Sequence, residues 1–539
     1  MQRFVTHICA LCATLLIGVV AAQAAGHIYY VATTGSDSNP GTIDAPFATL
    51  NAAHALVQPG DTVYFRGGTY LLDPSQIMTP STTTGTGQYT YVFDLNKKGN
   101  ATSGRIVYAG YPGERPVFDF SQIRPETRIV GFYLHANYVH LKNFDIVGIT
   151  ATLHGHYQCE CVAARNGSYC ITENIAMHDN MAIGYYATKG SNNLVLNCDA
   201  YNNFDDYSAF KNDDYYNTYK ETGSVPSGST SETLGGNCDG FGFHATREVD
   251  SCNVFRGCRA YWNSDDGFDC INSKTAVIWD NCWAFYNGYE PGTNSKRGDG
   301  NGFKAGGYGM STPATGMPDN GIPQNVITHC IAFYNKSNGF YSNHHLGGCL
   351  WLNNTAMWNW KNYSMVNRAE ANQTGTATDI NGYGHILRRN VSFAPQDGSN
   401  KDLRHFTEID SAQCILDANV IAQAADFIDA TRLSYTKLAK IALCKQRQAD
   451  GSLPEVGFLR IAETSDLYTA NQGAVFENMP FIYGNVTDDD DEPQTPTESV
   501  SIAGANCIQT PIYTIMGQRV ATVQHGGIYI QNGRKLFIP

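Results

Sequence analysis

Residues 262–270, WNSDDGFDC, place three carboxylates within five positions of the chain: Asp265, Asp266 and Asp269. The sequence is otherwise sparing with charge, since only 16% of its residues are Asp, Glu, Lys or Arg. Crowded carboxylates repel one another unless they are exposed to water, protonated or bound to a cation. An exposed acidic turn is the simplest interpretation, and a cation site requires further carboxylates that the fold brings to this stretch.

A repeat in the sequence indicates which residues lie beside these carboxylates. Five segments align and end on Asn, and a second motif, [Asp/Asn]-Gly-Phe, follows each of the first four in strict alternation. Each repeat holds short strands of alternating polar and apolar residues, separated by turns and without a helical period. This pattern predicts an all-β stack of similar coils, a parallel β-helix. The segments are NCDAYNN (197–203), GCRAYWN (257–263), NCWAFYN (281–287), HCIAFYN (329–335) and NNTAMWN (353–359), and the second motif occupies 239–241, 266–268, 301–303 and 338–340.

Equivalent residues of stacked coils form columns along the stack. The repeat therefore predicts one column of asparagines and one of cysteines, to which we assign a structural role, because turn asparagines can bond to the next copy above. We expect the thiols to be buried and reduced, although an exported protein can form disulfides. The columns are Asn203, Asn263, Asn287, Asn335 and Asn359, and Cys198, Cys258, Cys282 and Cys330.

The Gly-Phe motif also aligns the acidic residues. It places Asp239 directly beside Asp266 on the preceding coil, with Asp265 and Asp269 close by, because neighbouring strands are about 4.8 Å apart. Four carboxylates in one patch cannot all stay ionised without a cation. A site built from oxygen ligands suits a hard ion, so the alignment predicts calcium.

Lys304 occupies the position of Asp269 one coil further on, and Tyr341 follows it in the same column. One interpretation is an Asp269–Lys304 salt bridge, which contributes little if exposed. The other is a general base, which requires a pKa lowered from its usual value by burial or by a cation. Calcium beside a lysine is suited to β-elimination from a uronate polymer: the cation binds the sugar carboxylate, lysine removes the C5 proton, and the 4-linked oxygen leaves.

The remaining sequence divides the chain into four parts. Residues 1–25 have an early arginine, an apolar run and small residues, which indicates a secretory signal peptide that contains two of the 16 cysteines. Residues 26–484 form the predicted β-helix. Within it, residues 46–70 contain a short capping helix followed by a strand. The insertions 204–236 and 288–300 are expected to form the walls of a groove. Residues 485–499 are an acidic Pro/Thr-rich linker, and 500–539 a small strand-rich module.

The charge balance limits the partners. With 36 basic and 49 acidic residues the net charge is −13, which argues against nucleic acid or an anionic membrane. An acidic substrate would then be held through a local cation. Apart from the leader, no apolar run is long enough to span a bilayer. We expect a secreted monomer.

The motifs NCDGFGFH (237–244), YWNSDDGFD (261–269) and GNGFK (300–304) resemble those of polysaccharide lyase family 9, whose members include calcium-dependent pectate lyases. The resemblance extends to about residue 395 and implies a right-handed parallel β-helix of about ten coils. It also implies calcium ligands at Asp239, Asp265, Asp266 and Asp269 and a base at Lys304. By the same resemblance His344 and His345 line the substrate groove, although exposed turn histidines are an equal interpretation. Tyr341 is a further candidate for the groove.

Several alternatives remain open from the sequence. The polymer is homogalacturonan by family default, and rhamnogalacturonan is the other candidate. A β-helix pectin hydrolase would use paired aspartates with downstream His-Gly and Arg-Ile-Lys motifs, which are not found there. A C5-epimerase would share the proton abstraction, whereas a non-catalytic glycan-binding stack would leave Lys304 without a role. The tail resembles terminal modules of exported Bacteroidetes proteins, which implies the periplasm or cell surface of a Gram-negative bacterium.

Overall fold

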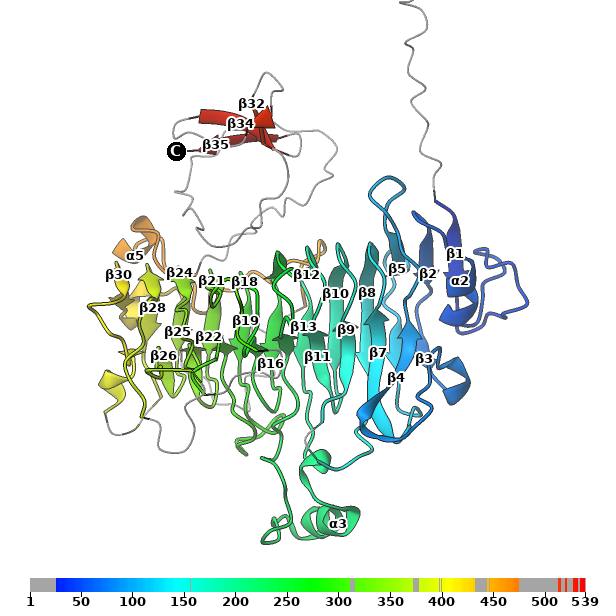
Figure 1. Ribbon diagram of the computed structural model, residues 1–539, viewed down its shortest axis with the longest axis horizontal. Helices are drawn as coiled ribbons and strands as arrows, with labels where there is room; N and C mark the ends of the chain where they lie inside the picture. The colour runs from blue at the N-terminus through cyan, green and yellow to red at the C-terminus, as the bar shows by residue number, and fades with distance from the viewer. Residues whose placement is uncertain are drawn as a thin grey trace, which may run out of the picture.

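The computed structural model describes residues 26–474, apart from 156, 311–315, 372–377, 397, 399, 432–443 and 445, and it also describes strands of the C-terminal tail. The predicted signal peptide and linker lie outside the described residues. Within the described part the chain is a stack of parallel strands with few helices, in which each coil contributes strands to three columns (Figure 1). This arrangement is a right-handed parallel β-helix, as predicted.

Two of the columns belong to one 21-stranded sheet in the described residues. The first column consists of β1 (Ile28–Val31), β2 (Thr62–Phe65), β5 (Ile106–Gly110), β8 (Val139–Val147), β10 (Ile171–His178), β12 (Leu194–Leu196), β15 (Asn253–Arg256), β18 (Val277–Asp280), β21 (Val326–Thr328), β24 (Leu350–Leu352), β27 (Ile386–Arg388) and β30 (Ile415–Asp417). The second contains β3 (Thr69–Leu71) and β6 (Val117–Asp119), shares the ends of β8 and β10, and continues through β13 (Asp199–Tyr201), β16 (Arg259–Tyr261), β19 (Trp283–Phe285), β22 (Ile331–Phe333), β25 (Thr355–Met357), β28 (Val391–Phe393) and β31 (Val420–Ile421).

The third column is a separate sheet of ten described strands, which agrees with the predicted number of coils. It contains Asp269 and Lys304, and Asp239, Asp265 and Asp266 lie shortly before two of its strands. Its strands, in order along the stack, are β4 (Gly85–Asp94), β7 (Thr127–Leu134), β9 (Glu160–Ala164), β11 (Ile183–Ala187), β14 (Phe241–Phe243), β17 (Phe268–Asp269), β20 (Phe303–Lys304), β23 (Asn338–Tyr341), β26 (Lys361–Ser364) and β29 (Phe406–Thr407).

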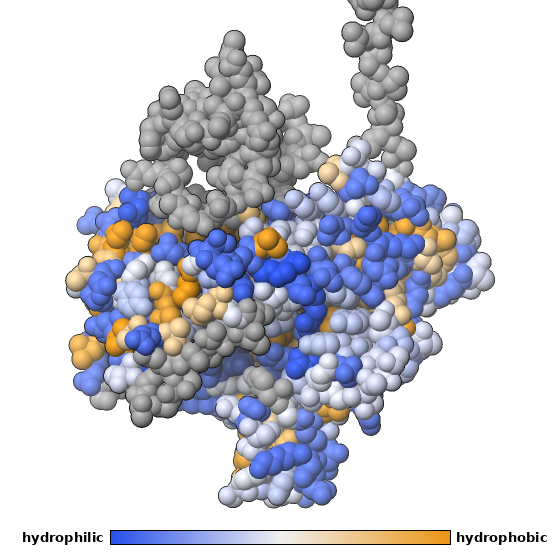
Figure 2. Space-filling view, viewed as in Figure 1, coloured by the Kyte–Doolittle hydropathy of each residue, from blue (hydrophilic) through white to orange (hydrophobic). Residues whose placement is uncertain are grey.

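Short helices decorate the stack. The predicted capping helix is α2 (Leu50–Leu56), which begins after the N-cap Thr49 and lies beside β1 at one end (Figure 1). The 204–236 insertion contains α3 (Asp213–Thr222), which projects from the stack as a lobe (Figure 1). The side of this lobe that Figure 2 shows carries mainly hydrophilic residues. The other helical segments of the described residues are η1 (Pro74–Gln76), η2 (Tyr207–Ala209), η3 (Lys401–Leu403), η4 (Ala424–Asp426) and α5 (Asp466–Thr469). Among the described residues, no helix has both the length and the apolar character that a membrane crossing requires.

The two sequence motifs alternate because they pack on each other. The side-chain amide of Asn287 donates to Asn335 Oδ1 at 3.0 Å and accepts from Asn263, and the predicted asparagine column is continuous from Asn203 to Asn359. A Cβ atom on Gly267 would lie 2.8 Å from Asn287 Nδ2 and 2.7 Å from the Gly302 carbonyl oxygen. Only glycine therefore allows each [Asp/Asn]-Gly-Phe turn to approach the ladder of the next coil.

The cysteine column is also confirmed. All four cysteines are buried and free, and each thiol donates to a main-chain carbonyl of the coil below, as Cys258 does to Val195. None of the described cysteines forms a disulfide. The tail contains a four-stranded antiparallel sheet formed by β32 (Ile512–Thr514), β33 (Arg519–Val520), β34 (Gly527–Gln531) and β35 (Arg534–Ile538).

Candidate functional site

The strand register brings the predicted residues together. Gly242 pairs with Asp269, Asp269 with Lys304, and Lys304 with Tyr341 on adjacent strands β14, β17, β20 and β23. The phenylalanines that precede them stack in the interior with ring planes 7° to 14° apart, so these neighbours point outward from the same face. The alignment that the Gly-Phe motif predicted is therefore confirmed.

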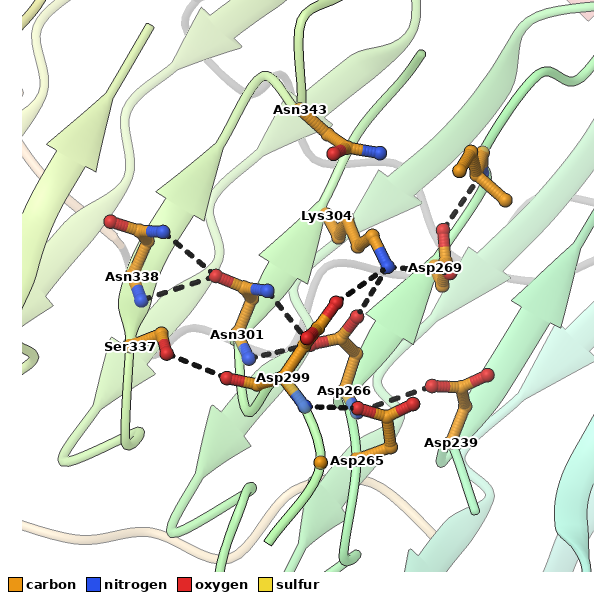
Figure 3. A network of polar contacts seen from close by, with 12 residues as sticks. Asp239, Asp265, Asp266, Asp269, Asp299, Asn301, Lys304, Ser337, Asn338 and Asn343 are labelled. Atoms are coloured by element: carbon orange, nitrogen blue, oxygen red, sulfur yellow. Dashed lines mark hydrogen bonds and ion pairs between the residues drawn. The ribbon is translucent and has the colours of Figure 1, made fainter. Parts of the chain in front are cut away.

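Three carboxylates converge at this face (Figure 3). Oxygen atoms of Asp239, Asp265 and Asp266 lie within 4.8 Å of one another, and all three side chains are buried. The backbone N–H of Asp266 donates to Asp239 Oδ1 at 3.1 Å, which fixes one coil against the next. Asp266 Oδ1 also accepts from the backbone and side-chain nitrogens of Asn301, at 2.6 and 2.9 Å.

The three clustered carboxylates repel one another when all are ionised and no cation is bound. Burial first, and the neighbouring carboxylates second, raise the pKa of Asp239 and of Asp265 well above the usual value. Burial raises the pKa of Asp266 to about 6, although Lys304 opposes this shift. Such pKa values mean that the folded protein favours protons, or another positive charge, at this position.

The donor set fits a hard cation. The three side chains offer only oxygen atoms, and among the described residues the buried Asp266 Oδ2 has no polar partner besides the Lys304 ammonium at 3.0 Å. Calcium prefers ligands of this type and tolerates irregular geometry. The buried acidic triad is therefore able to hold a metal ion.

Asp269, the fourth predicted ligand, does not belong to this group of three. Its Oδ1 accepts from the backbone N–H of Ile271 at 2.7 Å and lies 3.8 Å from His244 Nε2, whereas its Oδ2 lies 3.3 Å from Lys304 Nζ. Its carboxylate thus lies on the lysine side of the cluster, and its role as a ligand stays a prediction.

Lys304 lies at the centre of the acidic residues. Its Nζ is 3.0 Å from Asp266 Oδ2 and 3.3 Å from Asp269 Oδ2, and its side chain is only 11% exposed (Figure 3). Burial lowers the pKa of Lys304, but the negative charges of Asp266, Asp269 and Asp299 raise it by more than burial lowers it. The resulting pKa lies well above the usual value. The lowered pKa that a base requires is therefore not a property of these side chains alone, and it depends on positive charge at the carboxylates.

Sequence reasoning missed Asp299. Its carboxylate is 67% exposed, with Oδ2 3.4 Å from Lys304 Nζ, and its backbone N–H donates to Asp265 Oδ1. It is the next-to-last residue of the 288–300 insertion and directly precedes the GNGFK motif. That proximity to Lys304 in the sequence was the one signal that could have indicated it. Arg297 of the same insertion pairs with Asp206 of the 204–236 insertion at 3.1 Å, so the two insertions contact each other beside the site.

The other predicted groove residues differ in exposure. Tyr341 is partly exposed beside Lys304. His344 and His345 are buried, so they are not exposed turn residues. His345 accepts from the Gly307 N–H and contacts the Pro323 carbonyl oxygen through Nε2 at 2.7 Å, whereas His344 Nε2 lies 3.0 Å from Asp379 Oδ1. Burial lowers the pKa of each histidine to about 4, so both are neutral at pH 7.

Comparisons with known proteins agree with this geometry. The model of the Pel9A-like right-handed β-helix family matches residues 29–376, so the chain belongs to that family and is a polysaccharide lyase. A protein named pectate lyase L from Dickeya chrysanthemi is 33% identical over 449 residues, covering 82% of this chain and 85% of its own.

Two solved structures extend the comparison. One titled rhamnogalacturonan lyase superposes with a TM-score of 0.71 at 40% identity, covering 83% of this chain and 100% of its own. The structure of pectate lyase Pel9A gives a TM-score of 0.56 at 29% identity, with 82% and 90% covered. The hydrolase and non-catalytic alternatives receive no support from these relatives.

Proposed function

We propose that this protein cleaves an acidic pectic polysaccharide at a 4-linked galacturonate by calcium-dependent β-elimination. The observation that carries the proposal is the position of Lys304 Nζ, 3.0 Å from Asp266 within a patch of buried carboxylates on an outward-facing column. A buried lysine beside a hard-cation site provides both a proton acceptor and a counter-charge for an acidic sugar.

The carboxylates and the lysine have different roles in the proposal. Asp239, Asp265, Asp266 and Asp269 would hold calcium, which when bound supplies positive charge for the galacturonate carboxylate and for the negative charge that develops on it. Lys304 Nζ accepts the C5 proton, and the 4-linked glycosidic oxygen leaves as the double bond forms. Because the same carboxylates raise the pKa of Lys304, neutralising them favours the unprotonated amine that this step needs.

The relatives support two polymers. The pectate lyases at 29% to 33% identity favour homogalacturonan, our first candidate. The solved rhamnogalacturonan lyase, at 40% identity and the higher TM-score of 0.71, favours rhamnogalacturonan as the second. We also propose that residues 1–25 direct export, 26–484 form the lyase domain, 485–499 a linker and 500–539 a terminal module of a secreted, monomeric enzyme.

Ultraviolet absorbance tests the proposal, because elimination creates an unsaturated sugar and hydrolysis does not. The protein is incubated with polygalacturonate and with rhamnogalacturonan, first with calcium and then after chelation and dialysis. We expect absorbance to rise on one polymer, to stop after chelation and to return with calcium but poorly with magnesium, whose coordination is stricter. New reducing ends without absorbance, or full activity in metal-free protein, would refute the mechanism.

A further inference from the structure

The column that contains Lys304 continues away from Tyr341 into the first coils of the stack. From Asp269 it runs through Gly242 to Tyr186 on β11, and then through Ala163 on β9 to Tyr133 on β7. These strands are parallel and keep one register, so their side chains lie on the same outer face as Lys304. Tyr186 is three strands from Lys304, or about 14 Å at roughly 4.8 Å per strand.

This part of the face carries an unusual group of aromatic residues. The rings of Tyr91 and Tyr133 stack at 4.5 Å between centroids, and Tyr89 lies 6.0 Å from Tyr91 with the planes 14° apart. They pack around Val130 and Ala163 in an apolar cluster distinct from the interior core. Tyr89, Tyr91 and Tyr186 are each partly exposed. We call Tyr89, Tyr91, Tyr133 and Tyr186 the tyrosine platform.

Gly242 allows Tyr186 to extend toward the candidate site. A Cβ atom on Gly242 would lie 2.6 Å from Tyr186 Cδ2 and 3.1 Å from Cε2, so the ring lies against the main chain of β14. Tyr186 Oη lies 3.2 Å from His244 Nδ1, and His244 Nε2 lies 3.8 Å from Asp269. The platform is thus continuous with the acidic cluster through contacting side chains.

Two arginines frame the platform. The Arg165 guanidinium lies 4.6 Å from the Tyr89 ring centroid and 5.5 Å from that of Tyr186, and it pairs with the buried Glu160. Arg128 lies 5.3 Å from the Tyr89 ring and donates to its hydroxyl at 2.8 Å. Partly exposed rings beside cations provide flat apolar surface together with positive charge, in a protein whose net charge is −13.

We infer that the tyrosine platform binds further sugar residues of the acidic polysaccharide whose cleaved bond lies at Lys304, so the inference rests on the proposed function. The apolar faces of pyranose rings stack on Tyr91 and Tyr186, and sugar carboxylates lie near Arg165 and Arg128. The shared column argues for this occupant, because an extended chain that follows the outer face from Lys304 passes Asp269, Gly242 and Tyr186 in turn.

Binding is measured separately from cleavage. In a Lys304→Ala background, which retains the platform, calorimetry follows binding of long and of short galacturonate oligosaccharides and of rhamnogalacturonan in the presence of calcium. Two variants test the platform. Tyr186→Ala removes the ring, and Gly242→Ala displaces it by a new methyl group at a position whose backbone conformation any residue can adopt. Each should weaken binding of long chains about tenfold, the cost of losing one well-packed aromatic contact. Short oligosaccharides that do not reach the platform should be affected much less.

Two controls keep the test specific. Tyr186→Phe retains the ring and should retain most of the binding. Tyr169→Ala removes an exposed tyrosine that stacks on Tyr138 outside the platform, and it should leave binding unchanged. Equal losses of affinity for long and short chains would refute binding of the polysaccharide by the tyrosine platform. Unchanged affinity in both Tyr186→Ala and Gly242→Ala would refute it as well.

The two hypotheses fail differently. If the protein binds these chains through Tyr186 but releases no unsaturated product, the proposed function is wrong while the platform stands. If unsaturated product forms and platform variants bind as the parent does, the platform is wrong while the function stands. Length-dependent binding lost in Tyr186→Ala and retained in Tyr186→Phe supports the platform.

Discussion

Calcium and pH are expected to act together on the stability of the protein. The raised pKa of Asp266, about 6 against an ordinary 3.8, means that the folded state holds this proton more tightly than the unfolded state does. The stabilisation from that proton is complete below the unfolded pKa and is lost as pH rises through the folded pKa. Metal-free protein should therefore lose stability between about pH 4 and pH 7, and Asp239 and Asp265 act in the same direction.

The size of the effect follows from the same shift. About two pKa units at 1.36 kcal/mol each correspond to about 3 kcal/mol for Asp266, whose side chain is fully buried. Calcium that binds only the folded state returns a similar amount, about 2.7 kcal/mol when its concentration is one hundred times the dissociation constant. At pH 4 protons compete for the same oxygens, so calcium should contribute little there.

Thermal unfolding from pH 4 to pH 8, with calcium or with chelator, measures this coupling. We expect the melting temperature in chelator to fall across this range, and the difference between the two conditions to widen with pH. Asp266→Asn should reduce the pH dependence in chelator, and the part that Asp239 and Asp265 contribute should remain. The control Asp280→Asn removes a buried carboxylate paired with Arg256 on another face, and it should destabilise equally with and without calcium. A calcium effect that is the same at pH 4 and pH 8 would refute the reasoning.

Three further outcomes are expected from variants. Lys304→Ala should lose about 10²–10⁴-fold in turnover while calcium still binds, and Lys304→Arg should be almost as poor because guanidinium keeps its proton; an active Arg variant in the absorbance assay would leave only the salt bridge. Asp239→Ala and Asp266→Ala should each weaken calcium binding in calorimetry, with effects that do not add because both residues bind one ion. Unchanged calcium affinity in both variants would contradict the proposed calcium site. Asn287→Ala should cost about 2–4 kcal/mol in denaturant unfolding, because neighbouring ladder groups lose buried partners, while calcium affinity stays the same; a change below about 0.5 kcal/mol would contradict a structural role for the ladder.

The arrangement of Asp269 and Lys304 was predictable from the sequence because the repeat fixes which residues of neighbouring coils are in contact. Once Phe268 and Phe303 are aligned, the positions of Asp269 and Lys304 follow, since adjacent parallel strands in one register place equivalent residues side by side. The packing of Gly267 on Asn287 explains why the alignment is reliable, because a slip of one residue would place a Cβ atom inside the ladder.

Residues outside the repeat were not predictable in this way. Asp299 approaches Lys304 from an insertion, and Arg447 reaches back to bond Asp199 at 2.6 Å across 248 positions of sequence. A second asparagine column, Asn354 to Asn390 to Asn419, was missed because only its first member lies in an aligned segment. Contacts made by irregular segments have no period in the sequence, so composition and spacing give no signal for them.

The acidic cluster can exist because the asparagine column holds one of its ends and a main-chain hydrogen bond to the next coil holds the other. Asn263 is fixed in the asparagine column two residues before Asp265, and Gly267 donates its N–H to the Asn301 carbonyl one residue after Asp266, at 2.8 Å. Between them Ser264 bonds the Gly235 carbonyl at 2.7 Å. The short chain that carries Asp265 and Asp266 therefore has little freedom to separate its carboxylates, and their repulsion is borne by a rigid scaffold rather than relieved by movement. A site preorganised in this way binds a cation without the cost of gathering its ligands, which is why we expect calcium affinity to depend on the carboxylates and stability to depend on the ladder.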